Sequence, residues 1–284
     1  MLRSLRSFLR RGERGRLRLT RLKEEVEALR RQLDAVKSSL EVPPAMIDEF
    51  FDWKERHPLP ERPLVSVCVA TWNRAGLLTE RCIPSVLGQT WDRLELIVVG
   101  DGCTDDTEER VARIRDPRLT FVNQMERGVY PRDPERRWMV AGTHAINRAR
   151  RMATGDFVTQ LDDDDEFTPD RLEKLVRFCV AEGADFAWHP FWVEDAEGNW
   201  TVNEAKEFAS GQLTNGSVFY RSWFTRIEAD IQAHRLLEPG DWHRYRRILY
   251  IHPVLRRFPE PLLKHYREAV HRPAPAPAPA ASRR

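Results

Sequence analysis

The most informative stretch of the chain is FVTQLDDDDE, residues 157–166. Its first half favours a short buried strand, because Phe, Val and Thr are β-formers and Gly155 stops the preceding segment. Four consecutive aspartates, at 162–165, follow directly. Crowded carboxylates repel one another, and a hard cation such as Mg2+ or Mn2+ relieves that repulsion. The alternative is a solvated acidic turn that caps a helix expected near Pro169.

A calcium-binding EF-hand loop starting at the first aspartate is excluded. Such a loop needs Gly at its sixth position for a sharp turn. Phe167 stands at that position, and Pro169 follows closely.

Length and composition favour one main domain. The chain has 284 residues, 41% of them hydrophobic, which suffices for a substantial core. Net charge is +2 but uneven: residues 1–31 hold 11 Arg and Lys against 4 Glu, and the remainder holds 35 basic against 40 acidic residues. The basic head suggests contact with an anionic surface. We expect no nucleic-acid partner, because the remaining arginines are mixed with acids.

The location is expected to be cytoplasmic, with peripheral contact at the inner face of the membrane as an option. The four cysteines show no CxxC spacing, which fits a reducing compartment. No apolar stretch approaches the ~20 residues that cross a bilayer, and no secretory signal is recognisable.

The N-terminal segment, residues 1–42, is predicted to be helical. Its apolar residues alternate spacings of three and four: Leu19, Leu22, Val26, Leu29, Leu33, Val36 and Leu40. This a/d pattern predicts a coiled coil and a homodimer through residues 19–40. The alternative is an amphipathic helix that folds onto its own domain. The basic end preceding it is either a membrane-surface helix or solvated.

Prolines divide the rest of the chain. Residues 43–63 are predicted to be a Pro-containing linker, and residues 271–284 alternate Pro and Ala as an extended tail. Between them, residues 64–270 alternate strand and helix patterns. Strands are expected at 64–70, 94–99, 119–122 and 157–161, and helices near 75–87, 105–114, 140–152 and 170–180. This alternation predicts an α/β fold, with a Rossmann-like, mostly parallel sheet flanked by helices.

Polar groups follow three of these strands, where such sheets bind ligands. Asp101 after the second strand could accept the ring N–H of uracil or thymine. Trp72 after the first could stack on the base, and backbone N–H groups around Thr71 and Asn73 could bond to the nucleotide. The aspartates would then bind a cation bridging the diphosphate. Taken singly, each motif could also be a simple cap and turn.

Residues 64–170 resemble the family 2 glycosyltransferases of GT-A fold. The motifs that carry the resemblance are TWNR at 71–74, SVLGQTW at 85–91, ELIVVGDG at 95–102, AIN at 145–147, ATGD at 153–156 and LDDDD at 161–165. The resemblance continues less closely to about residue 267. The chain departs from the family at Trp72, where the family usually has Tyr, at Gly100, where it usually has Asp, and at Gly240, where it more often has Glu or Asp.

The resemblance implies roles for these residues. Those implied to hold the nucleotide sugar are Thr71, Trp72, Asn73, Asp101, Asn147 and Asp163. Asp164 would be the main ligand of Mn2+ or Mg2+ in a DXD motif, with Asp162 as a second ligand. Asp241, after Pro239-Gly240 and at a helix start, resembles the element that carries the catalytic base. Its alternative is a first-turn helix acid.

The resulting hypothesis is an inverting, metal-dependent, hexosyltransferase-like enzyme. It would move a sugar from a UDP- or dTDP-sugar to a hydroxyl of a carbohydrate or glycoconjugate acceptor, in cell-surface polysaccharide or glycoconjugate synthesis. A catalytically silent GT-A domain, acting as a coiled-coil interaction module, is the alternative. A nucleotidyltransferase would want a Gly-rich phosphate loop with a Lys after the first strand, and residues 71–76 lack one.

Overall fold

The computed structural model describes residues 21–30 and 42–267. The chain divides into two compact units, Met1–Pro44 and Ala45–Arg284. In neither described range is any helix long and apolar enough to cross a bilayer.

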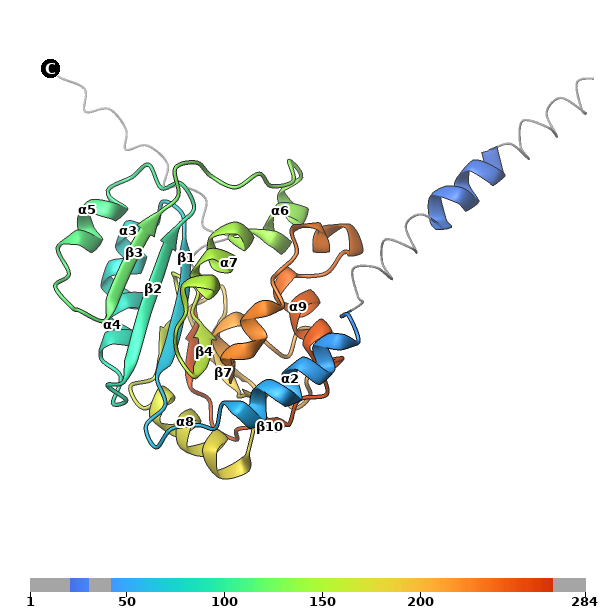
Figure 1. Ribbon diagram of the computed structural model, residues 1–284. Helices are drawn as coiled ribbons and strands as arrows, with labels where there is room; N and C mark the ends of the chain where they lie inside the picture. Colours follow the sequence, from blue (N-terminus) through green and yellow to red (C-terminus); the bar gives the residue numbers. More distant parts are fainter. Residues whose placement is uncertain (1–20, 31–41, 268–284) are drawn as a thin grey trace, which may run out of the picture. The chain divides into compact units, whose positions relative to one another are not determined.

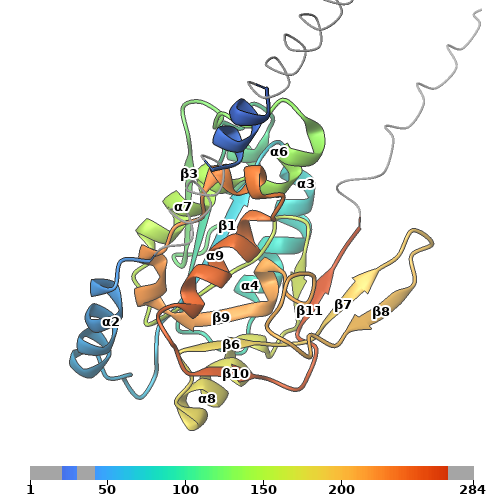
Figure 2. The same ribbon diagram turned by 90° about the vertical axis from the view of Figure 1, so that its right-hand side faces the viewer.

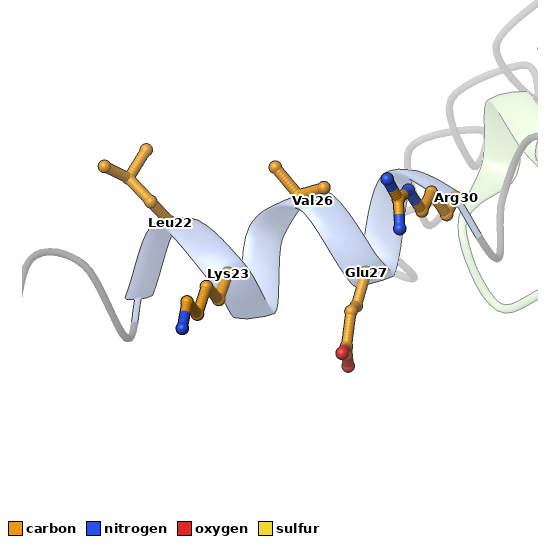
Figure 3. A pocket seen from close by; sticks show the side chains of 5 residues that line it. All are labelled: Leu22, Lys23, Val26, Glu27 and Arg30. Carbon is orange, nitrogen blue, oxygen red and sulfur yellow. The ribbon is translucent and has the colours of Figure 1, made fainter.

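The described part of the first unit, residues 21–30, is helical. Leu22 and Val26 extend from one side of this helix, whereas Lys23 and Glu27 extend from the other (Figure 3). Every residue of this helix is exposed, including Leu22, Val26 and Leu29 of the predicted apolar seam. The rest of the seam lies outside the described residues, so the coiled coil and the homodimer stay predictions.

The second unit is built on a seven-stranded sheet (Figure 1). In spatial order its strands are β10 (Leu255–Arg257), β6 (Phe186–Trp188), β9 (Val218–Arg221), β4 (Phe157–Gln160), β1 (Val65–Thr71), β2 (Leu94–Gly100) and β3 (Leu119–Asn123). The pairs β4–β1, β1–β2 and β2–β3 are parallel, and β9 is antiparallel to both of its neighbours. The predicted mostly parallel sheet is therefore confirmed, and all four predicted strands agree with the structure to within one residue.

Helices cover both faces of this sheet. Figures 1 and 2 show α7 on one face and α3 and α4 on the other. The helices of this unit are α2 (Ala45–Arg56), α3 (Ala75–Leu77), α4 (Ile83–Leu87), α5 (Thr107–Ala112), α6 (Pro134–Val140), α7 (Thr143–Met152), α8 (Arg171–Glu182) and α9 (Gly240–Leu249). A π-helical turn, η1 (Leu78–Cys82), joins α3 to α4, so the predicted helix over 75–87 is continuous. Short 3-10 turns lie at η2 (Asn215–Ser217), η3 (Ser222–Arg226) and η4 (Ile231–Leu236).

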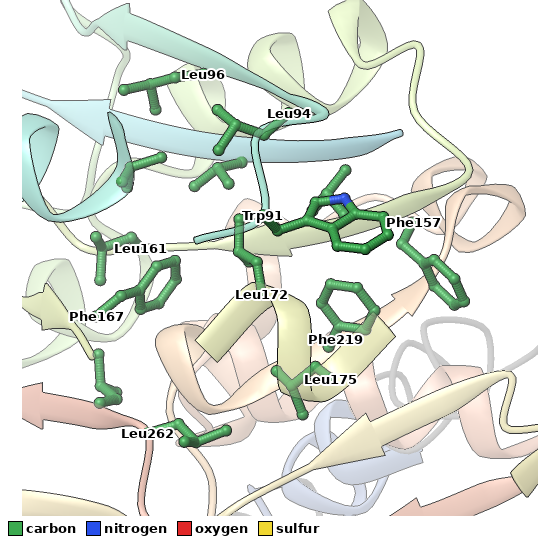
Figure 4. Packing of buried hydrophobic residues seen from close by; sticks show 14 of the residues in the cluster. Trp91, Leu94, Leu96, Phe157, Leu161, Phe167, Leu172, Leu175, Phe219 and Leu262 are labelled. Atoms are coloured by element: carbon green, nitrogen blue, oxygen red, sulfur yellow. The ribbon is translucent and has the colours of Figure 1, made fainter. Parts of the chain in front are cut away.

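The main hydrophobic core lies on the α4 and α8 side of the sheet. Alternate residues of β1, such as Val67, contribute to it, as do Phe157 and Phe219 from β4 and β9. Figure 4 shows Leu172 and Leu175 of α8 in this cluster. Full burial of such a side chain contributes about 1.5–3 kcal/mol. The core thus fixes the strands whose ends carry the polar motifs.

A smaller sheet stands beside the large one. Its strands, in order, are β5 (Glu166–Phe167), β11 (Leu263–His265), β7 (Phe191–Glu194) and β8 (Trp200–Asn203). The β7–β8 hairpin extends outward from the body in Figure 2. Because β5 directly follows the aspartates, this sheet brings β11, about 100 residues later in the chain, to the acidic run.

Two expectations need correction. The helix predicted over 140–152 is broken, because α6 ends at Val140 and α7 begins only at Thr143. Between them Ala141 has an extended ψ of 142° and Gly142 a left-handed φ of 74°. Helix α2 also lies inside the segment predicted as a linker. Its buried Phe50 packs against Trp223 and Phe224 at centroid distances of 5.1 and 4.9 Å, so this part belongs to the folded unit.

Candidate active site

The ends of β1, β2 and β4 meet at one edge of the large sheet. Thr71 pairs with Gly100 in the β1–β2 register, and the backbone N–H of Asp101 donates to Thr71 O at 2.8 Å. On the other side of β1, the N–H of Leu161 donates to Cys68 O at 3.1 Å. Parallel pairing therefore places the three polar motifs together, as the sequence predicted.

Asp101 is buried and already holds hydrogen-bond partners. Its carboxylate accepts from the Tyr130 hydroxyl at 2.7 Å and from the Gly128 N–H at 3.1 Å. Burial, together with the bond to this carboxylate, raises the pKa of Tyr130. The loop between β3 and α6 thus covers the carboxylate that was predicted to read the base.

The same loop covers Trp72. The Arg127 guanidinium lies over the indole, 3.2 Å from the ring centroid. The ring is 41% exposed, and such a face suits a planar or cationic partner. Arg127 therefore occupies the face on which a nucleobase was expected to stack.

Asn73 shapes the turn that follows β2. Its side-chain oxygen accepts from the backbone N–H of Thr104 at 2.8 Å, and its amide donates to the Thr104 hydroxyl at 3.1 Å. Its φ of 52° is left-handed, a conformation that Asn tolerates better than most residues. The side chain of Asn73 thus joins the loops that follow β1 and β2.

Asp163 and Asp164 converge on one cationic nitrogen. Nη1 of Arg74 lies 2.9 Å from Oδ1 of Asp163 and 2.9 Å from Oδ2 of Asp164. Both carboxylates are buried. Burial raises the pKa of Asp163 to about 6, although Arg74 opposes that shift.

This pair fits a divalent cation. Within residues 21–30 and 42–267, no three His, Cys, Asp or Glu side chains form a ready-made metal site. Mg2+ is commonly held by only one or two protein carboxylates, with substrate phosphates completing its shell. The Arg74 nitrogen acts as a stand-in cation and shows that the oxygens of Asp163 and Asp164 can share one positive charge.

Asp162 is engaged on another side. Its Oδ1 accepts from Asn215 Nδ2 at 3.1 Å and from Gln160 Nε2 at 3.4 Å. Burial and the neighbouring carboxylates raise its pKa to about 7, and Asp241 adds to that shift. The structure thus places Asp162 toward α9 and leaves its role as a metal ligand a prediction.

Asp241 lies in the first turn of α9, as predicted. Burial raises its pKa. On the same helix, the Tyr245 hydroxyl donates to Asn215 Oδ1 at 3.2 Å, and Asn215 in turn bonds to Asp162. These two hydrogen bonds hold α9, which carries the candidate base Asp241, in place relative to the aspartates at 162–165.

Asn147 has a different setting from the strand-end residues. Its amide donates to Ala229 O at 2.8 Å, and its oxygen accepts from Ala229 N at 3.0 Å and from Arg150 at 3.2 Å. These contacts bind α7 to the segment before η4. They favour a structural role for Asn147. That Asn147 contacts the nucleotide sugar stays a prediction.

Several residues that contact the aspartates at 162–165 were not predicted from the sequence. His265 Nδ1 lies 2.8 Å from Asp165 Oδ2, and the Tyr266 N–H donates to Asp165 Oδ1 at 3.0 Å. Burial would lower the pKa of His265, but the bond to Asp165 and the nearby carboxylates raise it to about 9. Arg81 lies 3.7 Å over the Tyr266 ring and donates to Asp164 O at 2.8 Å. No local sequence signal linked residues so far apart.

Comparison with known proteins gives the class. Residues 66–237, more than half of the chain, match the family described as Glycosyl transferase family 2. The chain therefore belongs to glycosyltransferase family 2, and it is a transferase by that membership.

The relatives cover parts of the chain. WcaA of Escherichia coli K12, whose name describes a glycosyl transferase of colanic acid biosynthesis, is 34% identical over 117 residues. The match covers 40% of this chain and 37% of WcaA, so the chain spans little more than a third of that relative.

Solved structures share the fold. Staphylococcus aureus TarS 1–349 in complex with UDP has a TM-score of 0.57 at 17% identity, over 72% of this chain and 60% of that chain. The mannosyltransferase PcManGT from Pyrobaculum calidifontis, in complex with GDP-Man and Mn2+, has a TM-score of 0.54 at 20% identity. The match covers 77% of this chain and 64% of PcManGT. The predicted GT-A type fold is confirmed by this likeness together with the family match.

Proposed function

We propose that the protein transfers a sugar, with inversion, from a UDP- or dTDP-sugar to an acceptor hydroxyl. One observation carries the proposal: a member of glycosyltransferase family 2 has Asp101 and the Asp163–Asp164 pair at the carboxyl edge of its sheet, with Asp241 near enough to raise the pKa of Asp162. The neighbouring structures, which hold UDP and GDP-Man, support a nucleotide-sugar donor.

The nucleoside would bind at Asp101 and Trp72. A buried carboxylate accepts the ring N–H of uracil or thymine, and the indole offers a stacking face. Thr71 and Asn73 would line this cradle through their backbone. The loop carrying Arg127 must rearrange, because it occupies both surfaces.

Asp163 and Asp164 would hold Mn2+ or Mg2+ with the donor diphosphate. A divalent cation there would neutralise charge on the departing nucleoside diphosphate. The Mn2+ in the PcManGT complex supports this assignment.

Asp241 would act as the general base. Inversion is a single displacement, so a base must take the proton of the acceptor hydroxyl as its oxygen attacks the anomeric carbon. Burial, which raises the pKa of Asp241, makes it a stronger base than an exposed aspartate. The contacts from Tyr245 through Asn215 to Asp162 would set its position relative to the donor.

The acceptor is proposed to be a carbohydrate or glycoconjugate, in synthesis of a cell-surface polysaccharide. The match to WcaA, whose name describes a transferase of polysaccharide biosynthesis, supports this process. We place the acceptor near α9 and η2, because the proposed base Asp241 lies on α9 and Tyr245 of that helix bonds to Asn215 of η2. We also propose a cytoplasmic homodimer, joined through residues 19–40, whose basic N-terminus contacts the membrane peripherally.

The test uses the purified full chain with a panel of UDP-, dTDP- and GDP-sugars and Mn2+. Nucleoside diphosphate release is measured with and without oligosaccharide acceptors, and NMR reports the anomeric configuration of the product. Release from a UDP- or dTDP-sugar with an inverted product supports the proposal. Binding of no nucleotide sugar by the folded protein would favour the catalytically silent interaction module.

A further inference from the structure

Arg74 occupies the place at which two buried carboxylates meet. A single nitrogen, Nη1, lies 2.9 Å from oxygens of both Asp163 and Asp164. The carboxylate side chains are 7% and 11% exposed, whereas the arginine side chain is 35% exposed. The positive charge therefore enters an enclosed acidic site from its open side.

Arg74 is held differently from other arginines in the core. Arg171 and Arg244 are fully buried, and each bonds to several backbone carbonyls. Within residues 42–267, hydrogen bonds from the Arg74 guanidinium reach only Asp163 and Asp164. Its side chain is partly exposed, and apart from these two carboxylates only the charge of Asp162, within the described chain, adds to the attraction on its guanidinium.

We propose that Arg74 is an exchangeable counter-ion: it pairs with Asp163 and Asp164 in the metal-free enzyme and leaves them when a divalent cation binds. A cation held by the same two carboxylates would lie close to the guanidinium, and like charges at that separation repel strongly. One of the two must leave the carboxylates.

The displaced guanidinium would then bind the diphosphate of the donor, a step that rests on the proposed function. Its planar fork matches two phosphate oxygens at once, and it carries a permanent charge. Arg74 is anchored between β1 and α3, so its side chain stays at the mouth of the site after it leaves the carboxylates. The exchange would make cation binding and donor binding mutually dependent.

The test compares binding of three probes to the full-length protein by calorimetry: Mn2+ alone, UDP with saturating Mn2+, and uridine. Arg74→Gln removes the charge but keeps an amide donor. We expect Mn2+ alone to bind this variant roughly 10-fold more tightly than the wild type, in the range typical of coupled sites. UDP should bind roughly 10-fold more weakly, and uridine should bind equally well, because it carries no phosphate.

A matched control removes the same charge elsewhere. Arg113 is exposed and pairs with Glu109, so Arg113→Gln should leave the affinity for all three probes unchanged. Equal or weaker Mn2+ binding by Arg74→Gln would overturn the exchange. Weaker binding of all three probes would also overturn it, because it would indicate a structural role for Arg74.

The two proposals fail in different ways. If the wild type binds neither UDP nor uridine, the nucleotide-sugar function fails, and the Mn2+ comparison still decides whether Arg74 competes with a cation. If the wild type and Arg74→Gln bind UDP equally, the function stands and the diphosphate contact of Arg74 is wrong.

Discussion

His265 and Asp165 join two distant parts of the chain at the acidic run, with His265 Nδ1 2.8 Å from Asp165 Oδ2. Asp165 is fully buried and also accepts the Tyr266 N–H, so it fastens β11 to the loop that follows β4. Asp165 is therefore held by β11, as Asp162 is held by Asn215 and Gln160. Asp163 and Asp164 are the two that face an exchangeable charge.

His265→Ala should destabilise the protein without abolishing nucleotide binding. Removing one partner leaves the buried Asp165 under-bonded, which costs about 1–3 kcal/mol. The half-exposed position of His265 favours the lower part of that range. Denaturant unfolding should show a lower free energy of unfolding at an unchanged m-value. In the same assay the exposed pair variant Arg113→Gln should change by less than about 0.5 kcal/mol. A similar change in both variants would contradict the anchoring role.

Asp164→Asn should remove transfer while keeping the fold. Asparagine lowers the repulsion within 162–165 but is a poorer ligand for a hard cation. We expect ~100-fold or more loss of rate at saturating donor, because stabilisation of developing charge is a large catalytic term. The assay is nucleotide release at increasing Mn2+, with circular dichroism as the check on folding. Near-normal turnover at saturating Mn2+ would exclude Asp164 as the main ligand.

Tyr130→Phe should strengthen UDP binding. The Tyr130 hydroxyl donates a hydrogen bond to the Asp101 carboxylate, and a nucleobase that bonds to the same carboxylate must first displace this hydroxyl. Removing this competing bond should tighten UDP binding by about 2- to 10-fold, as expected for one hydrogen bond. Calorimetry at saturating Mn2+ measures the change, with the exposed Tyr250→Phe as the matched control. Weaker binding would mean that Tyr130 stays in the complex and contacts the nucleotide.

Replacing Leu22, Val26 and Leu29 together by Gln should turn the predicted dimer into a monomer that keeps its activity. These residues are exposed on the helix over 21–30, and the proposed site residues all lie in the second unit. Light scattering at micromolar concentration measures the mass, and Lys23→Gln serves as the control. A wild-type protein that is already monomeric would contradict the predicted homodimer through residues 19–40.

The placement of much of the candidate site could be predicted from the sequence. Parallel neighbouring strands end at the same edge of a sheet, so polar residues that follow them lie together. Asp101, Asp163 and Asp164 follow from it, and their strands were located to within one residue. His265 could not be found in that way, since it reaches Asp165 through the three-residue strand β11 and long-range pairing has no local signature. The break at Gly142 was missed for another reason: a glycine within a helical pattern is compatible with continuation until its φ is known.

Asp241→Asn should remove turnover and spare donor binding. Asparagine keeps the shape of aspartate and one oxygen that can accept the Trp242 N–H, but it cannot take a proton. Loss of a general base typically costs ~100- to 10,000-fold in rate. Asp101→Ala should do the opposite and weaken UDP binding, because it removes the proposed base contact. The exposed Asp52→Asn on α2 is the control and should behave as the wild type.

The pH dependence of the wild type reports on Asp241 together with Asp162 and Asp163, whose pKa values are raised to about 7 and about 6. The base must be deprotonated to act, and burial raises its pKa above the ordinary value of 3.8. Rate at saturating donor should therefore rise with pH on an acid limb that lies above that value. The measurement is kcat between pH 4 and pH 8, with circular dichroism across the range to exclude acid unfolding. If Asp241→Asn instead lost UDP affinity while its rate at saturation survived, Asp241 would belong to the donor site, and another residue would have to supply the base.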